Sequence, residues 1–338
     1  RITINLAPAD LPKEGGRFDL PIALGILSAS GQLPPQDLRR HEFLGELALD
    51  GSLRPVPGVV AAAAAANRAR RHLVVATSSA PLAAHVPGAE VIAAPDILTL
   101  CAHLNGSAKL SSALPSTCIA SPAPPDLRDV VGQQGARRAL EIAASGGHNL
   151  LLWGPPGTGK TLLASRLPGI LPPPDTQEVL QALALRDLFD PAARENFTFQ
   201  RPFRNPHHSA TPAALAGGGG RPRPGEISLA HGGVLFLDEL PEFGRHCLEV
   251  LREPMESGEI TLSRANHRIT YPARFQLVAA MNPCPCGYLG DTERPCRCTP
   301  EQIQRYRSRV SGPLLDRIYL HVQVNRLPPS DLLNPRQS

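Results

Sequence analysis

The chain has 338 residues, of which 42% are hydrophobic and 4% aromatic, and its formal net charge is +4. This length is enough for two ordinary domains, each with its own core. No apolar run approaches the roughly 20 residues that span a bilayer, and no secretory signal pattern opens the chain, so we expect a cytoplasmic protein with no membrane partner.

The first third of the chain alternates between short apolar strands and helices. Strands are predicted over Ile2–Leu6, Phe43–Leu49, Leu73–Ala76 and Glu90–Ala93, and helices over Asp19–Ser30, Val59–Arg70 and Asp96–Leu104. Because the chain begins at Arg1 inside an expected strand and without an initiator methionine, we expect it to be a fragment.

A segment rich in Ser, Ala and Pro, residues 107–125, lacks a sustained period and predicts a linker. We therefore expect a first domain over residues 1–107, a linker over 108–126 and a second domain over 127–338. In the second domain, apolar strands predicted over Asn149–Trp153, Val234–Leu237 and Phe275–Ala280 are separated by helical stretches. This order predicts an α/β nucleotide-binding domain built on a parallel sheet.

The segment GPPGTGKT follows the first of these strands and opens a helix, which is the context that a phosphate-binding loop requires. Its glycines allow backbone N–H groups to point at phosphates, and the helix N-terminus adds a favourable dipole. Lys160 is expected to reach the β and γ phosphates, and the Thr161 hydroxyl to bind Mg²⁺. The residues expected to contact ATP here are Gly154, Pro155, Pro156, Gly157, Thr158, Gly159, Lys160 and Thr161.

Two carboxylates follow the predicted strand Val234–Leu237, at the strand end where ligands bind in open α/β sheets. We expect Asp238 to hold Mg²⁺ through water and Glu239 to polarise the attacking water. A simple helix cap is the alternative, but the phosphate loop upstream in the same domain makes it the weaker interpretation.

Two further residues complete the predicted hydrolytic site. Asn282 ends the third strand, where its amide can orient water against the γ-phosphate. Arg317 follows a short helix in GPLLDRI and is predicted to reach a neighbouring subunit's nucleotide as an arginine finger. A surface salt bridge with Asp316 is the alternative for Arg317.

Residues 260–275 predict a β-hairpin with two runs of β-branched residues around Ala265, Asn266 and His267. Arg264, His267 and Arg268 at its tip are candidate contacts to a nucleic-acid backbone. Between positions 260 and 310 the sequence has eight arginines against three carboxylates, which favours a polyanionic partner. A solvated hairpin with scattered arginines is the alternative.

The segment PHHSATPAALAGGGG, residues 206–220, precedes the acidic strand and predicts a mobile loop. It is either a second loop, besides the hairpin, that lines a central pore and contacts the nucleic acid, or an exposed insertion. A zinc role for His207 and His208 is not expected, because neither histidine has a metal partner nearby in the sequence.

Four of the seven cysteines lie between positions 284 and 298. An odd cysteine count with one tight cluster favours a reducing compartment and a metal site or free thiols. Cys284, Cys286, Cys296 and Cys298 form two C-x-C pairs, and four thiolates can close a tetrahedral Zn²⁺ shell. We favour structural zinc that fixes the connection between Asn282 and the helix starting at Thr299, whose T-P-E-Q run resembles a capping box with proline at the first helical position. An oxidisable thiol pair or simply reduced cysteines are the alternatives.

The phosphate loop, FLDE, the strand ending in Asn282 and LLDR together resemble an AAA+ ATPase. The phrases FRNPHHSATPAALAGGGGRPRPGEISLAHGGVLFLDELPEF and MNPCPCGYLGDTERPCRCTPEQIQRYRSRVSGPLLDRI resemble the magnesium-chelatase-like branch of that superfamily, and within it the ComM (YifB) family. The resemblance covers nearly the whole chain. It implies that Val131 and Gln133 lie near the adenine, and that a helical lid with a sensor arginine follows Ser338.

The first domain resembles the Lon-protease-type domain, which has a ribosomal-S5-like α+β fold. LPKEGGRFDLPIALGILSASG is similar to the stretch carrying the Lon nucleophile, and GELALDGSLRPVPGVVAAAAAANRA to the stretch carrying its lysine. Arg17 stands about where that serine would be and Val60 about where the lysine would be. Because valine supplies no base, we expect a domain without proteolytic activity.

The resemblance implies a ring-forming ATPase, hexameric, that uses ATP and Mg²⁺ to move along branched or single-stranded DNA during recombination or natural transformation. Two alternatives stay open at this stage. One is the ATPase subunit that drives magnesium insertion into a porphyrin, and the other is an ATP-dependent protease or remodeller of proteins.

Overall fold

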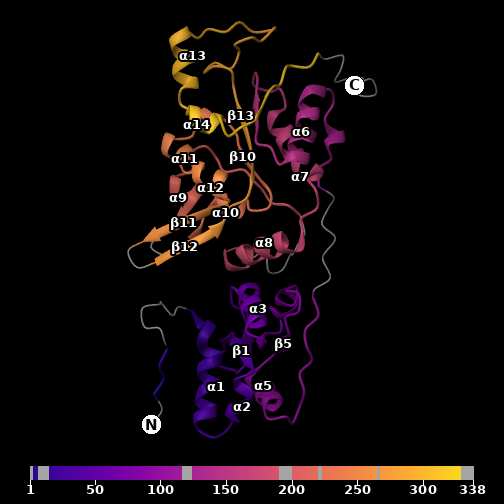
Figure 1. The fold of residues 1–338 in the computed structure, drawn as a ribbon, viewed down its shortest axis with the longest axis vertical. Coiled ribbons are helices and arrows are strands. Elements are labelled where there is room, and N and C mark those ends of the chain that lie inside the picture. Colours follow the sequence, from indigo (N-terminus) through magenta and orange to yellow (C-terminus); the bar gives the residue numbers. More distant parts are fainter. Residues whose placement is uncertain are drawn as a thin grey trace. The chain divides into compact units, whose positions relative to one another are not determined.

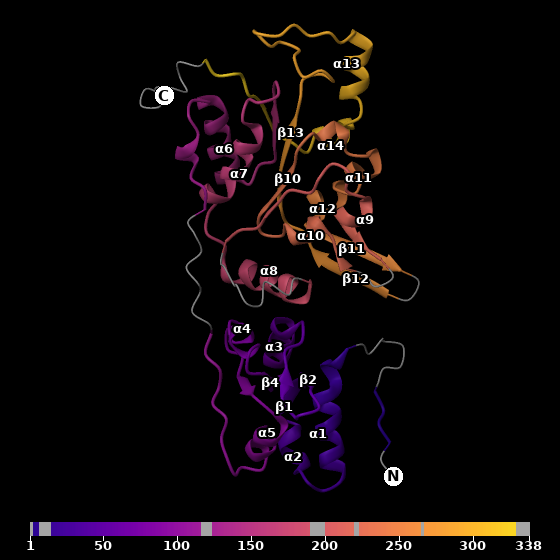
Figure 2. The same cartoon turned by 180° about the vertical axis from the view of Figure 1, so that it is seen from behind.

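The structure is a computed structural model that describes residues 3–6, 15–115, 124–189, 200–219, 223–264 and 267–328. The chain divides into two compact units (Figures 1 and 2). The first comprises Arg1–Ile119 with Leu183–Thr198, and the second Ala120–Ala182 with Phe199–Ser338. No helix of the described residues is long and apolar enough to cross a membrane.

The first unit is built on a three-stranded parallel sheet of order β1-β4-β5 and a separate two-stranded hairpin, β2-β3. Leu20 and Leu24 of α1 pack with Val74 of β4 and Leu100 of α5 in its core. Its elements are η1 (Gly16–Phe18), α1 (Asp19–Ala29), α2 (Pro35–Leu38), β1 (His41–Leu44), β2 (Glu46–Leu47), β3 (Leu53–Arg54), α3 (Val59–Arg68), β4 (His72–Ala76), α4 (Ala80–Ala83), β5 (Val91–Ala94) and α5 (Ile97–Leu104).

Two of the predicted strands differ from the structure. Residues 3–6 of the strand expected over Ile2–Leu6 have no regular structure, and Ile4 is 51% exposed, whereas a strand needs a hydrogen-bonded neighbour. The strand expected over Phe43–Leu49 is broken at Gly45. The carbonyl of Gly45 accepts from the N–H of Leu20, and the N–H of Gly45 donates to the carbonyl of Arg17. Both backbone groups of Gly45 therefore bond to residues at the start of α1 and not to a neighbouring strand.

Helix α8 (Thr176–Phe189) contributes its last residues to the first unit. Asp187 is fully buried there and accepts the N–H of Val60 at 3.1 Å. Gly58, at the N-cap of α3, has no side chain to satisfy the free N–H groups of that helix start. The carboxylate of Asp187, which is distant in the sequence, therefore caps the start of α3.

The second unit contains a five-stranded sheet of order β14-β6-β13-β10-β7 whose pairings are all parallel. This confirms the predicted α/β fold class, and β10 (Val234–Leu237) matches its predicted bounds. All four side chains of β10 are buried, because a parallel sheet is covered on both faces. Figures 1 and 2 show α6 and α7 on one side of β10 and β13 and α9, α11 and α12 on the other.

The core of this unit lies between the sheet and helices α6 and α7. Phe236 of β10 and Val278 of β13 pack with Leu150 and Leu152 of β6 and with Leu163 of α7. The remaining elements are η2 (Leu127–Asp129), α6 (Gln134–Gly146), β6 (Leu150–Trp153), α7 (Lys160–Ile170), β7 (Phe203–Arg204), α9 (Pro212–Ala216), β8 (Gly217–Gly218), β9 (Arg223–Pro224), α10 (Glu226–Leu229), η4 (Leu240–Glu242), α11 (Arg245–Glu249), α12 (Arg252–Ser257), β11 (Glu259–Arg264), β12 (His267–Pro272), β13 (Gln276–Met281), α13 (Pro300–Arg307), α14 (Gly312–Leu315) and β14 (Leu320–Gln323).

Candidate nucleotide-binding site

The loop between β6 and α7 has the backbone of a phosphate cradle. Gly157 and Gly159 take φ values of +77° and +87°, a region that favours glycine, and a Cβ at either would meet nothing within 4 Å. At Gly154 a Cβ would collide with the carbonyl of Val324. The loop is therefore open on the side where phosphates would lie and tightly packed at its base.

The ammonium group of Lys160 is held inside this loop. Its Nζ donates to the carbonyls of Gly154 at 2.7 Å and Pro155 at 2.8 Å and to Oδ1 of Asn282 at 3.2 Å. Burial lowers the pKa of Lys160, and the negative charges of Asp238 and Glu239 oppose that shift. These three acceptors hold the ammonium inside the loop, and a bound phosphate would compete with them for it.

Thr161 and Asp238 meet across the sheet edge. The Thr161 hydroxyl donates to Oδ2 of Asp238 at 2.7 Å, although the residues are 77 positions apart. Because β6 and β10 run parallel, their carboxyl ends lie at the same edge. A hydroxyl and a carboxylate at this spacing are hard oxygen donors of the type that Mg²⁺ binds.

Glu239 follows Asp238 in a left-handed backbone conformation, φ +53°, which is uncommon for a residue with a side chain. Its N–H donates to Oδ1 of Asp238 at 2.9 Å, and its Oε2 lies 3.0 Å from Nδ1 of His208. The sequence did not predict the His208 contact. The two adjacent histidines after a short strand were the available signal, but their partner is distant in the chain.

Gln133 joins the loop from the other side. Its Nε2 donates to the carbonyl of Asn325 at 2.6 Å and more weakly to that of Thr158 at 3.4 Å, and its φ is +51°. Val131, two residues earlier, is half-buried. The structure thus brings Gln133 to the phosphate loop, and its place beside the adenine stays a prediction from the resemblance.

Arg317 is not brought to the phosphate loop by any described contact. Its guanidinium bonds Glu256 of α12 and the carbonyl of Pro313, and 24% of its side chain is exposed. Its own carbonyl accepts from Nδ2 of Asn149 at 2.9 Å. The ion pair considered in the sequence involved Asp316, whereas the structure pairs Arg317 with Glu256.

The four clustered cysteines converge. All four Sγ atoms lie within 4.8 Å of one another, with Cys284–Cys286 at 3.4 Å, Cys286–Cys296 at 3.6 Å and Cys284–Cys296 at 3.7 Å. A tetrahedron with Zn–S bonds of about 2.3 Å has S···S edges of about 3.8 Å. The thiol spacing therefore fits a single Zn²⁺, and Cys298 would complete the shell.

The thiols also differ in acidity. Burial raises the pKa of Cys286, but the N–H groups of Arg297 and Tyr288 and the thiols of Cys284 and Cys298 together lower it to about 6. A thiolate at Cys286 is thus available near neutral pH, and thiolate is the form that binds metals.

This cysteine cluster is joined to the nucleotide site. The Arg307 guanidinium donates to the carbonyl of Pro283 at 3.2 and 3.1 Å. Tyr306 is buried beside Asn282; burial raises its pKa to about 12, although a hydrogen bond from the backbone of Asn282 opposes this. Gly287, φ +85°, packs so closely on Pro156 that a Cβ would lie 2.8 Å from its Cδ.

The hairpin β11-β12 forms as predicted, with antiparallel pairing from Glu259↔Pro272 to Arg264↔His267. It extends away from the parallel sheet beside α9 and α10 (Figures 1 and 2). Arg268 is exposed. The side chains of Arg264 and His267 lie outside the described part of the hairpin, so the DNA contacts remain predictions.

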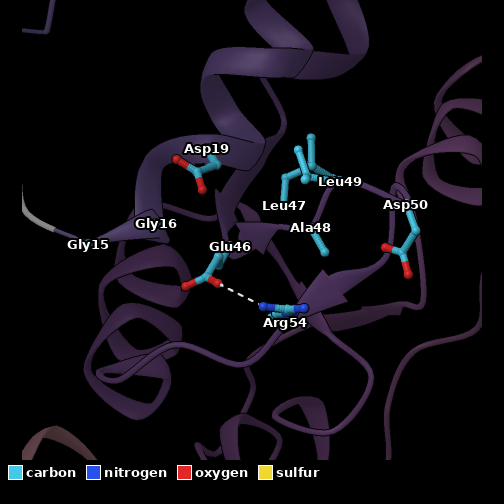
Figure 3. A pocket seen from close by; sticks show the side chains of 9 residues that line it. All are labelled: Gly15, Gly16, Asp19, Glu46, Leu47, Ala48, Leu49, Asp50 and Arg54. Atoms are coloured by element: carbon cyan, nitrogen blue, oxygen red, sulfur yellow. Dashed lines mark ion pairs between the residues drawn. The ribbon is translucent and has the colours of Figure 1, made fainter.

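The first unit holds a cavity of 640 Å³, lined by Gly15, Gly16, Asp19, residues 46–50 and Arg54 (Figure 3). In this cavity Arg54 and Glu46 form an ion pair at 3.6 Å. Among the residues that the structure describes, this lining includes no Ser, Thr, Cys or Lys. Arg17 lies in η1 beside this cavity's Gly16, and Val60 is 2% exposed in the core.

A parallel sheet with a glycine loop, a buried lysine and an acidic pair at one edge defines a P-loop nucleotide-binding domain. Comparison with known families agrees. Residues 126–332 match the family described as magnesium chelatase, subunit ChlI, and residues 1–79 match the family described as subunit ChlI of Mg-chelatase. The chain belongs to this magnesium-chelatase-like AAA+ family, in its ComM/YifB branch.

Individual relatives agree with that assignment. The chain is 54% identical over 338 residues to the uncharacterized protein YifB of Salmonella typhimurium, matching 100% of this chain and 66% of that protein. It is 52% identical over 339 residues to the competence protein ComM of Haemophilus influenzae, matching 99% of this chain and 66% of that protein. The chain thus spans just under two thirds of the length of these relatives.

More distant similarity reaches chelatase subunits and a solved structure. Over 109 residues the chain is 29% identical to magnesium-chelatase subunit ChlI-1 of Arabidopsis thaliana, matching 32% of this chain and 20% of that protein. The crystal structure of NtrX from Brucella abortus in complex with ADP aligns with 58% of this chain and 37% of its own, at a TM-score of 0.35 and 16% identity.

Proposed function

We propose that the second unit binds and hydrolyses ATP. One observation carries the proposal: the ammonium of Lys160 lies between loop carbonyls and Asn282, while Asp238 bonds Thr161 next to it. Polar groups from the ends of β6, β10 and β13 thereby meet at one sheet edge.

Each group has a distinct task in this proposal. Lys160 and the loop N–H groups bind the phosphates, and Asn282 orients the attacking water. Thr161 and Asp238 would hold Mg²⁺, which neutralises charge on the phosphate oxygens. Glu239 accepts the proton of the attacking water, and Arg317 acts on the nucleotide of a neighbouring subunit in a hexameric ring.

We further propose that the motor moves along branched or single-stranded DNA as a branch-migration helicase in the cytoplasm. Support comes from the printed name of the competence protein ComM and from the arginine-rich hairpin. The exposed Arg268, with Arg264 and His267 at the tip, would follow a phosphate backbone.

The test is the ATPase rate of the full-length parent protein without DNA and with single strands, duplex and four-way junctions. Glu239→Gln serves as the blank. Strong stimulation by branched or single-stranded DNA, lost on changing Arg264 and Arg268 to Ala, supports the DNA motor. If none of these DNAs changes the Lys160-dependent ATPase rate, the DNA partner is refuted and the proposed ATPase activity stands.

Oligomerisation is tested separately by native mass spectrometry in the presence of ATP and Mg²⁺. We expect six copies. Arg317→Ala is expected to bind ATP normally and to lose hydrolysis by at least tenfold, because an arginine finger acts on the transition state. Equal loss of binding and hydrolysis would contradict the arginine-finger role.

We also propose one structural Zn²⁺ per chain, held by Cys284, Cys286, Cys296 and Cys298. The convergent thiol geometry supports it. Elemental analysis is expected to find one zinc per chain in the full-length parent and little in Cys284→Ser, with Cys247→Ser, which removes a buried thiol of α11, as the control. Metal-free wild-type protein would refute the site.

The family description favours a second candidate, an ATPase subunit that drives magnesium insertion into a porphyrin. Its test is whether a tetrapyrrole, instead of DNA, stimulates the ATPase. A protease is disfavoured because Arg17 and Val60 stand about where a Lon-type site would carry its serine and its lysine, and valine supplies no base.

A further inference from the structure

The backbone of Arg317 is fixed at the amino edge of the parallel sheet. Its carbonyl accepts from Nδ2 of Asn149, the residue before β6, at 2.9 Å, and Oδ1 of Asn149 accepts the N–H of Leu277 in β13 at 2.8 Å. The phosphate loop follows the opposite end of β6. Asn149 and Gly154 are five positions apart along an extended strand, on the order of 15 Å. Arg317 is therefore out of reach of the phosphate loop of its own chain.

The guanidinium group of Arg317 is held by two acceptors. Its Nη2 donates to Oε1 of Glu256 in α12, and its Nη1 donates to the carbonyl of Pro313. Each of these nitrogens carries a second N–H, for which the described residues offer no acceptor. Because 24% of the side chain is exposed, these N–H groups are the ones that can bind an incoming phosphate.

Glu256 stands on a firmly held helix end. Gly258 caps α12 at φ +71°, with its N–H on the carbonyl of Pro254. The carbonyl of Gly258 in turn accepts the N–H of Ala273, the residue after β12, at 2.8 Å. The base of the hairpin β11-β12 is thus bonded to the end of α12, which runs into β11 (Figure 1). Both partners of the ion pair consequently rise from fixed backbone.

The ion pair can affect Arg317 in two ways, through its charge or through its direction. Glu256 is 62% exposed, so solvent screens most of the effect of its charge on the guanidinium. Direction is the larger effect, because a free arginine side chain has about 2 kcal/mol of rotamer entropy to lose when it binds a phosphate. An acceptor that already fixes the guanidinium removes part of that cost.

We propose that Glu256 is a positioning residue that orients Arg317 towards the nucleotide of the neighbouring subunit. The inference rests on the arginine-finger role of Arg317 in the proposed ATPase. Losing one exposed partner of this type corresponds to a change of about two- to fivefold in rate.

The first experiment measures kcat and KM for ATP with the full-length parent protein, without DNA so that the result does not depend on the proposed DNA partner. Glu256→Ala is expected to lower kcat about two- to fivefold with KM unchanged. Glu256→Gln, which keeps an acceptor oxygen, is expected to stay within twofold of wild type. Glu253→Gln, which changes an exposed carboxylate of the same helix, is the matched control and is expected to leave kcat unchanged.

The second experiment mixes subunits and separates positioning from damage to the variant's own site. Glu256→Ala is assembled with an excess of Glu239→Gln, which cannot hydrolyse ATP but carries an intact Arg317. Most Glu256→Ala sites then face a normal arginine of the neighbouring subunit. Their rate per competent subunit is expected to equal that of wild type mixed with the same excess. Arg317→Ala, treated identically, is the positive control.

An unchanged or raised kcat in folded Glu256→Ala overturns the inference. So does a loss that persists in mixed rings while Arg317→Ala is restored, because the defect then lies in the variant's own site; the arginine-finger role stands in that case. If neither variant is restored, the arginine-finger role itself fails. If wild-type protein shows no hydrolysis that depends on Lys160, the proposed ATPase fails.

Discussion

Replacing Gly287 by alanine tests whether the cysteine cluster supports the phosphate loop. The added Cβ would lie 2.8 Å from Cδ of Pro156, which is 0.6 Å short of the 3.4 Å at which ordinary contact begins. Pro156 must move, and the loop N–H groups that follow it move with it. We expect ATP affinity to fall about tenfold, the equivalent of one misaligned charge-assisted hydrogen bond of about 1.5 kcal/mol.

Gly290→Ala is the matched control. Gly290 has a similar backbone, φ +81° against +85° for Gly287, but a Cβ there would meet nothing within 4 Å. Each substitution is expected to cost about 1–2 kcal/mol of stability through left-handed strain, which lowers Tm by about 2–4 °C per kcal/mol for a unit of this size. Thermal melts measure this shared cost.

Titration with a fluorescent ATP analogue measures the difference between the variants. The expected result is weakened binding in Gly287→Ala alone, with comparable melting temperatures in both variants. Equal affinities in wild type, Gly287→Ala and Gly290→Ala would refute the mechanical link, and so would an equal loss in both variants.

Three further substitutions probe the fold. Thr299→Ala removes the capping box of α13 and should lower the free energy of unfolding by about 1 kcal/mol in denaturant melts, whereas Thr299→Ser should not. Burial lowers the pKa of His231 below 6.5, and its Nδ1 accepts the N–H of Arg274. Because the unfolded state then binds more protons, stability should fall as pH drops through 6.5, more steeply in wild type than in His231→Gln; parallel pH profiles would contradict this. Asp187→Ala leaves the N–H of Val60 unpaired and should cost about 1–3 kcal/mol, measured by thermal and denaturant melts; a change within ±0.5 kcal/mol would refute the capping role.

The sequence by itself determined the features whose causes are local. Four apolar residues bounded by glycine and an acidic pair predicted β10 with its observed bounds. The run Thr-Pro-Glu-Gln predicted the start of α13, where Thr299 and Gln302 satisfy each other's backbone N–H groups. Four cysteines within fifteen positions could meet with little loop to close, so their convergence was also predictable.

Only the tertiary structure decided which distant groups meet. Lys160 and Asn282 are 122 positions apart, and Asp187 and Val60 are 127 apart. No periodicity encodes such pairs, because they depend on strand order and on which loops share a sheet edge. The break at Gly45 and the contact between His208 and Glu239 belong to the same class: each backbone or side-chain group finds its partner only after the sheet has brought remote segments together.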